Sequence, residues 1–146
     1  MKGPAELCPE EVAFIDLVRT VEMLSHPVAQ LLKTEDLSPT QYNVLRILRG
    51  ASGGLTCGEI ANRMVTRDPD ITRLLDRLER RNLVCRSRES KDRRVVLTQI
   101  SPDGLKLLSR LDIPVRDTHR KLLGHFGPER LRTLSRLLSE ARRALA

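Results

Sequence analysis

A short arginine-rich helix followed at once by a basic hairpin constrains this chain more than any other feature of its sequence. The apolar residues of the helix recur at i, i+3, i+4 and i+7: Ile71, Leu74, Leu75 and Leu78. This spacing predicts a helix with one narrow buried stripe. We expect Asp68 to cap the helix, Pro69 to occupy its first position, and Asn82 to end it in the left-handed conformation.

The side opposite the apolar stripe is polar. Arginine forks match guanine edges and phosphates and are poorly suited to burial, so this side is a candidate surface for reading duplex DNA. Its candidate DNA-binding residues are Thr66, Pro69, Asp70, Thr72, Arg73 and Arg77. The alternative is a solvated helix face on which ion pairs such as Asp76 with Arg80 have no functional consequence.

The hairpin is predicted from two runs rich in β-branched residues, 84–89 and 95–100, joined by the polar turn 90–93. Between Arg80 and Arg94 there are seven basic and two acidic residues, which is typical of a wing beside a recognition helix. We expect Arg94 to reach the minor groove and Asp92 to support the wing. The other wing candidates, for phosphate contact, are Arg86, Arg88 and Arg93. A charged hairpin that only prevents edge pairing is the alternative.

Two capping patterns precede the arginine-rich helix. Ser38-Pro39-Thr40-Gln41 predicts the start of a helix that ends near Gly50. Thr56-Cys57-Gly58-Glu59 predicts a second, short helix over residues 59–64. That short helix, the turn at 65–67 and the helix that follows together indicate a helix-turn-helix.

Both ends of the chain are expected to be helical, with a kink or restart near Pro27 and a kink near Pro114. The helices expected there cover residues 10–25, 28–33, 102–123 and 128–145. Their apolar faces are broad, yet the central region closes a small core of its own. A second copy of the chain would cover these faces and place two recognition helices about 34–36 Å apart, one turn of DNA.

Charge and aromatic content narrow the class of partner. The net charge of +7 suits a polyanion. Readers of RNA and single strands stack bases on aromatic rings, and only Phe14, Tyr42 and Phe126 are aromatic here. Three scattered cysteines describe no disulfide framework, and the first residues contain no apolar signal core. We therefore expect a cytoplasmic protein that binds duplex DNA.

Three segments, in this order and at these separations, resemble the MarR family of bacterial transcription regulators. Residues 37–45 resemble the family's second helix, and residues 70–79 followed by Asn82-Leu83-Val84 resemble its recognition helix. Asp92-Arg93-Arg94 and 100–104 resemble the wing motif and the start of the fifth helix. The resemblance implies an obligate homodimer with a winged helix-turn-helix in each subunit. It also implies binding to a duplex operator, with repression relieved by a small ligand or an oxidant.

The predicted fold is mainly α with a small β-hairpin wing. One domain spans residues 1–146, with a winged helix-turn-helix lobe over 36–101 flanked by dimerisation helices at 1–35 and 102–146. The sequence departs from the family pattern at Pro27 and Pro114, and at Asp70, where many relatives carry Ser or Thr. A carboxylate there accepts a hydrogen bond from a cytosine amine or favours the helix start.

The chain is also expected to have an effector site, and two other functions compete with DNA binding. The resemblance and the geometry together place a ligand pocket near Tyr42 and Arg46, between the winged helix and the dimerisation helices. Cys8, near the start of the first helix, is the candidate for oxidant sensing or for a thiol-redox protein. A module that binds an acidic protein partner is the other alternative. His26, His119 and His125 match no metal-ligand spacing, and no catalytic motif is visible, so we expect no cofactor, no metal and no enzyme.

Overall fold

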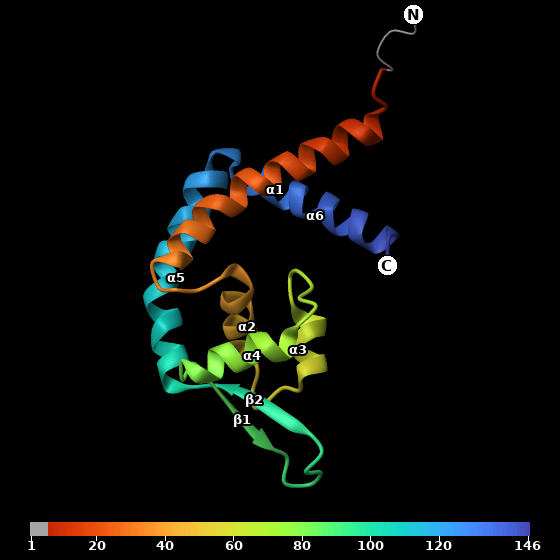
Figure 1. Cartoon of the computed structure of the whole chain (residues 1–146). Helices are drawn as coiled ribbons and strands as arrows, with labels where there is room; N and C mark the ends of the chain where they lie inside the picture. The colour runs from red at the N-terminus through yellow and green to blue at the C-terminus, as the bar shows by residue number, and fades with distance from the viewer. Residues whose placement is uncertain (1–5) are drawn as a thin grey trace, which may run out of the picture. The chain divides into compact units, whose positions relative to one another are not determined.

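The computed structural model describes residues 6–146, and over these the chain is mainly helical with one antiparallel hairpin (Figure 1). The elements are α1 (Pro9–Lys33), α2 (Pro39–Gly50), α3 (Cys57–Arg63), α4 (Ile71–Arg80), β1 (Val84–Arg88), β2 (Val96–Ile100), α5 (Pro102–Leu123), the 3-10 turn η1 (Gly124–Phe126) and α6 (Pro128–Ala144). This confirms the mainly α fold with a hairpin wing. The first five residues of the expected 1–35 segment lie outside the described residues.

The chain divides into two compact units. One comprises residues 29–115, and the other comprises the described residues up to 28 together with 116–146. Both divisions fall just after a proline, Pro27 in α1 and Pro114 in α5. The helix restart expected near Pro27 is wrong, because α1 continues through this proline, as α5 does through Pro114. A kink at either proline stays a prediction. Each proline removes only one backbone donor, and the remaining hydrogen bonds of these long helices carry the chain past it.

The starts of α2 and α3 are confirmed as capping boxes. Ser38 Oγ accepts from the backbone N–H of Gln41 at 3.1 Å, and Gln41 Oε1 accepts from the backbone N–H of Ser38 at 3.0 Å. Thr56 and Glu59 make the same reciprocal pair at 3.2 and 2.8 Å. Each box satisfies two donors that the helix itself leaves without partners, which fixes where each helix begins.

The start of α4 differs from the prediction. Asp70, not Asp68, is the N-cap, and its Oδ1 accepts from the backbone N–H of Arg73 at 3.1 Å. Asp68 instead accepts from the backbone N–H of Asp70 at 2.8 Å, in the turn that also holds Pro69. Both aspartates flank the proline and both can accept, but only Asp70 directly precedes the helical residues. The left-handed end at Asn82 is confirmed, with φ at 57°.

The core of the 29–115 unit lies between its helices and the hairpin. Its largest fully buried apolar side chains are Leu32, Leu45, Ile60, Leu75, Leu78 and Leu108. In the hairpin Val84 pairs with Ile100 and Arg88 with Val96, so both predicted strands are present, each one residue shorter. Thr98 of β2 also forms a bridge to Leu55, which ties the segment after α2 to the sheet.

Three arginines join elements of this unit through hydrogen bonds. Arg49 of α2 donates from both Nη atoms to the carboxylate of Asp112 in α5, at 2.8 and 2.9 Å. Arg81, directly after α4, donates to the backbone carbonyls of Glu35 and Asp36 at 3.0 and 2.6 Å. The carboxylate of Glu35 in turn accepts from Arg110 of α5 at 3.3 Å. The end of the recognition helix is therefore bound to the turn after α1.

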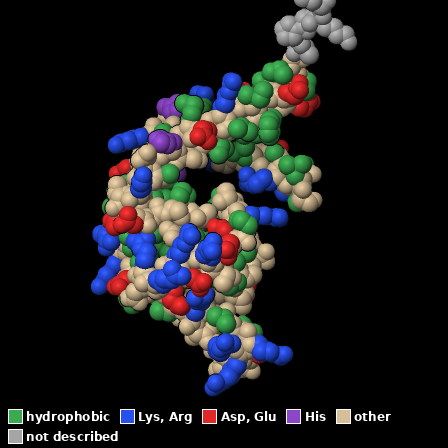
Figure 2. All heavy atoms as spheres, in the orientation of Figure 1, with side chains coloured by type: hydrophobic (Ala, Val, Ile, Leu, Met, Phe, Trp, Pro, Cys, Tyr) green, Lys and Arg blue, Asp and Glu red, His purple; other side chains and the backbone are tan. Residues whose placement is uncertain are grey.

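The other unit exposes most of its apolar side chains. Among its described residues, no side chain of α6 is buried. On α1 one face at i, i+3, i+4 and i+7 is exposed by 44–67%: Phe14, Leu17, Val18 and Val21. Figure 2 shows such hydrophobic side chains gathered over α1. We call these four residues the α1 apolar face. Within the described part of the chain, no helix has the length and hydropathy to cross a bilayer.

Candidate nucleic-acid interface

A rigid support holds α3 and α4 as a helix-turn-helix. Ile60 of α3 and Leu74 and Leu75 of α4 are buried together in the core of the 29–115 unit. The turn between the helices is fixed to α2, because Asn43 Oδ1 accepts from the backbone N–H of Val65 at 2.8 Å. Because α3 and α4 share this core and their turn is bonded to α2, the two helices hold a fixed orientation. The polar side of α4 therefore faces solvent.

The structure brings the predicted recognition-helix residues onto one exposed side. Thr66, Pro69, Thr72, Arg73 and Arg77 are all exposed. Arg73 makes only a long ion pair with Asp70, at 3.7 Å, and its side chain is 70% exposed. Among the described residues, none forms a hydrogen bond or ion pair with the Arg77 side chain. The Asp70 carboxylate, in contrast, is engaged as the N-cap of α4.

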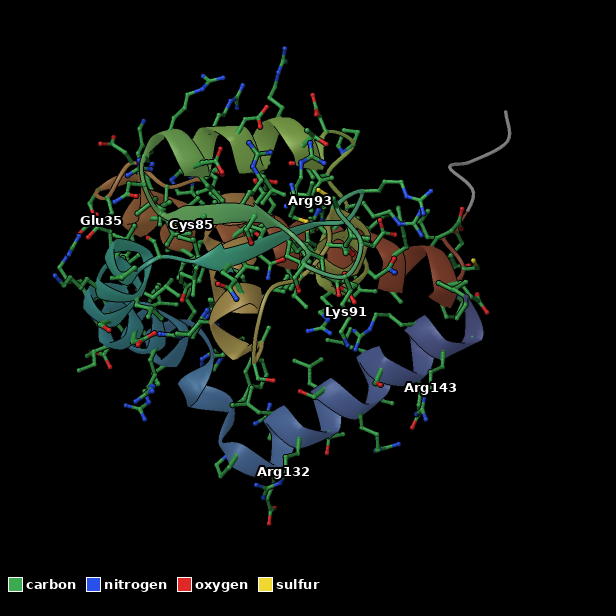
Figure 3. The ribbon with its side chains drawn as sticks, turned by 90° about the horizontal axis from the view of Figure 1, so that it is seen from below. Glu35, Cys85, Lys91, Arg93, Arg132 and Arg143 are labelled. Atoms are coloured by element: carbon green, nitrogen blue, oxygen red, sulfur yellow. The ribbon has the colours of Figure 1, made fainter. Side chains whose placement is uncertain are left out.

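The wing presents further arginines. The Arg94 side chain is 92% exposed, and Asp92 Oδ1 accepts from its backbone N–H and from its Nε at 3.0 and 3.3 Å. Arg88 braces the hairpin by donating to the backbone carbonyl of Arg93 at 2.8 Å. Figure 3 shows Lys91 and Arg93 at the turn of the hairpin. The turn is thus held by Asp92 and Arg88, and its basic side chains project from it.

Arg86 lies differently. Its Nη2 donates to Asp76 Oδ1 at 2.5 Å, and its Nε and Nη2 each donate to a carboxylate oxygen of Glu79 at 3.1 Å. The hydrogen bonds that Arg86 donates to Glu79 and then to Asp76 raise the pKa of Arg86 above its ordinary value. The bond from Arg86 likewise lowers the pKa of Glu79. Sequence reasoning could not foresee this cluster, since it depends on how β1 packs against α4.

A groove of about 490 Å³ opens beside the recognition helix, between the first turns of α2 and α4. Its lining is Asp36, Ser38, Thr40, Gln41, Asp68, Asp70, Arg73, Leu74 and Arg77. The sequence pattern predicts only a helix start at Ser38, Thr40 and Gln41. Their place next to Arg73 and Arg77 adds the first turn of α2 to the exposed polar surface.

The predicted effector residues Tyr42 and Arg46 lie together on α2, and the predicted redox residue Cys8 lies just before α1. Tyr42 is buried, and Cζ of the exposed Arg46 lies 5.8 Å from the centroid of its ring. Cys8 is exposed just before α1, and its backbone N–H donates to Glu11 Oε2 at 2.9 Å. That backbone bond, and the Cys8 thiol beside it, lower the pKa of Glu11.

Among residues 6–146, no group of three or more His, Cys, Asp and Glu side chains is disposed to hold a metal ion. Cys57 is half-buried and Cys85 is exposed on β1 (Figure 3), and both are free thiols.

Comparisons with known proteins agree on one family. The model of the MarR family matches residues 37–96. A crystal structure of a MarR transcription factor from Planctomyces limnophilus is 39% identical, covers 93% of this chain and 98% of that chain, and superposes with a TM-score of 0.70. The homoprotocatechuate degradative operon repressor of Escherichia coli is 27% identical over 75% of this chain and 74% of its own.

For a third similar protein, the regulation of its DNA binding by a small molecule has been studied. The structure of BpsR from Bordetella bronchiseptica, which concerns the regulation of its DNA binding by 6-hydroxynicotinic acid, is 23% identical to this chain. The likeness covers 96% of this chain and 98% of that chain, with a TM-score of 0.81. At this identity the likeness shows the shared fold.

Proposed function

This chain belongs to the MarR family of transcriptional regulators, and on that premise we propose that it is a homodimeric repressor that binds a pseudo-palindromic duplex operator. The observation that carries the proposal is the exposed arginine surface of α4 and the wing on a rigid helix-turn-helix. A DNA-binding regulator performs no chemical conversion, so the protein is not an enzyme. Its place of action is the cytoplasm, where bacterial operators lie.

We assign the DNA contacts by exposure and by available donors. Arg73 and Arg77 read base edges or phosphates in the major groove, and Arg94 enters the minor groove. Contacts to phosphates and close approach to the backbone come from Thr66, Pro69, Thr72, Arg88 and Arg93. Asp92 supports the wing and does not touch DNA. Asp70 serves α4 as its cap, which favours the helix start over a cytosine contact.

The dimer places two such surfaces on one operator. We propose residues 1–35 and 102–146 as dimerisation helices and 36–101 as the DNA-binding lobe. Support comes from the α1 apolar face and from Leu134 and Leu137 of α6, all exposed in the single chain. Contiguous exposed apolar faces of this kind indicate a protein interface. A two-fold axis then pairs the two recognition helices across a symmetric operator.

A small molecule is the effector that we propose. The related BpsR is regulated by 6-hydroxynicotinic acid, and Tyr42 with Arg46 offers an aromatic ring and a cation for a similar planar anion. Oxidant sensing by the exposed thiol of Cys8, just before α1, is the alternative to a small-molecule effector. Treating the protein with hydroperoxide should leave operator affinity unchanged in both the wild type and Cys8→Ser. A loss of affinity confined to the wild type would instead identify Cys8 as the sensor.

Selection of duplexes from a random pool by the purified protein tests the proposed function. We expect an enriched pseudo-palindrome, and affinity for it should fall steeply as salt rises because lysine and arginine displace counterions from phosphates. Failure to enrich any duplex at low ionic strength would contradict DNA recognition. Binding to an acidic protein with no duplex preference would favour an interaction module instead.

Replacing Arg94 with alanine should weaken operator binding by at least about 1 kcal/mol, the lower end for a specific contact. The side chain is so exposed that its loss should leave the fold intact. Fluorescence anisotropy at fixed salt measures the effect. Arg132→Ala, an exposed arginine of α6 labelled in Figure 3, is the control and should bind as the wild type does. Equal affinities of both variants would remove Arg94 from the interface.

A further inference from the structure

Arg86 differs from the other wing arginines in where its guanidinium points. Its Nε and Nη2 are occupied by the two carboxylates of Asp76 and Glu79, at 2.5–3.1 Å. Its side chain is 23% exposed, whereas that of Arg94 is 92% exposed. In Figure 3, β1, which carries the neighbouring Cys85, runs alongside α4. Arg86 therefore faces the recognition helix and not the solvent in front of the wing.

The two carboxylates lie where they would oppose DNA if they were uncovered. Asp76 follows Arg73 by three residues and directly precedes Arg77, so it shares the exposed side of α4 with both. Its side chain is 38% exposed and that of Glu79 is 42% exposed. A negative charge beside the reading arginines repels phosphates, and like charges across an interface lower affinity strongly.

We propose that Arg86 is a positioning residue for DNA recognition, which masks the charges of Asp76 and Glu79 and does not touch the duplex. This inference rests on the proposed function, since it concerns binding of an operator. The guanidinium fork matches the carboxylate of Glu79 and reaches Asp76 at the same time, which a single ammonium cannot do. The ion cluster also joins β1 to α4, so that the wing and the recognition helix meet the DNA as one body.

The salt dependence of binding separates masking from direct contact. Arg86→Met removes the charge and keeps most of the aliphatic length. We expect affinity for the selected operator to fall about tenfold at low salt, because the carboxylates of Asp76 and Glu79 lose their shared partner and repel phosphates, and to fall less as salt screens this repulsion. In the triple variant that also carries Asp76→Asn and Glu79→Gln no charge is unmasked, so the slope of log K against log salt should stay at its wild-type value because no phosphate contact is lost. The matched control Arg93→Met, an exposed wing arginine, should make that slope shallower by about 0.9.

A rescue experiment tests the mechanism itself. Adding Asp76→Asn and Glu79→Gln to Arg86→Met replaces the whole cluster with neutral side chains of similar shape. We expect affinity to return to within about threefold of wild type, because the charge that needed masking is gone. The triple variant leaves no unpaired charge, so it keeps the test decisive even if Arg86→Met alone fails to fold. Circular dichroism and thermal melting confirm that each variant is folded.

The contrary results are distinct. A slope shallower by about 0.9 in the triple variant would show a lost phosphate contact and overturn the proposal. Failure of the triple variant to regain affinity while folded would overturn masking as well. A wild-type protein that binds no duplex is a failure of the proposed function, and it is seen before any variant is compared.

Discussion

Val21→Asp should abolish the dimer and lower operator affinity at least about a hundredfold, because a two-fold interface would bury the new carboxylate twice without a partner. Val21 belongs to the α1 apolar face and is 60% exposed in the single chain. The substitution therefore costs the isolated chain little, and its penalty arises only when a second copy covers this face. Sedimentation at micromolar concentration measures the dimer, and anisotropy with the selected operator measures affinity.

Thr20→Asp is the matched control for this variant. Thr20 lies on α1 next to Val21, is exposed, and points away from the apolar face at about 100° per residue. It introduces the same charge, so it should leave both the dimer and the operator affinity unchanged. A Val21→Asp protein that still sediments as a dimer would show that another surface makes the interface.

Gly104→Ala should destabilise the protein by about 3 kcal/mol and lower Tm by about 10 °C, since overpacking of a buried site typically costs 1–3 kcal/mol or more. Gly104 lies in the first turn of α5 and is buried. A Cβ there would stand 2.4 Å from the carbonyl oxygen of Leu83 and 2.7 Å from Cγ1 of Ile100. The backbone carbonyl cannot turn aside, because it already accepts from the N–H of Ser101 at 3.0 Å.

Gly50→Ala should stabilise the same protein, in contrast to Gly104→Ala. Gly50 ends α2, and no atom lies within 4 Å of where its Cβ would be. Replacing it should raise stability by about 0.5–1 kcal/mol, because alanine loses less backbone entropy in a helix. Thermal melting of both variants gives the comparison. Equal melting temperatures for the two would contradict the close approach of α5 to the hairpin.

Local patterns predicted the starts of helices well where one residue alone could serve as the cap. Ser38 and Thr56 each stand three residues before a Gln or Glu, and both capping boxes form. At α4 two aspartates flank Pro69, and sequence alone favoured the wrong one. The choice depends on backbone angles, since Asp70 has the non-helical conformation that a cap requires.

Sequence patterns do not predict which side chains from different elements contact one another. The exposure of Arg73, Arg77 and Arg94 follows from periodicity, because the helix and the hairpin each bury a defined side. Arg86 carries the same residue type in the same basic hairpin, yet it faces two carboxylates of another element. Only the packing of β1 on α4 distinguishes it from its neighbours. For the same reason the sequence placed Ser38 and Thr40 in a cap but not beside a groove.

The contact of Arg81 with the carbonyls of Glu35 and Asp36 has a thermodynamic consequence. These hydrogen bonds couple the position of the turn after α1 to the position of the C-terminal end of α4. We expect a molecule that displaces this turn to shift the end of α4 as well, and an operator that holds α4 to resist the displacement. Linkage is reciprocal, so protein already seated on its operator should take up such a molecule more weakly, by the same factor as the molecule loosens the operator.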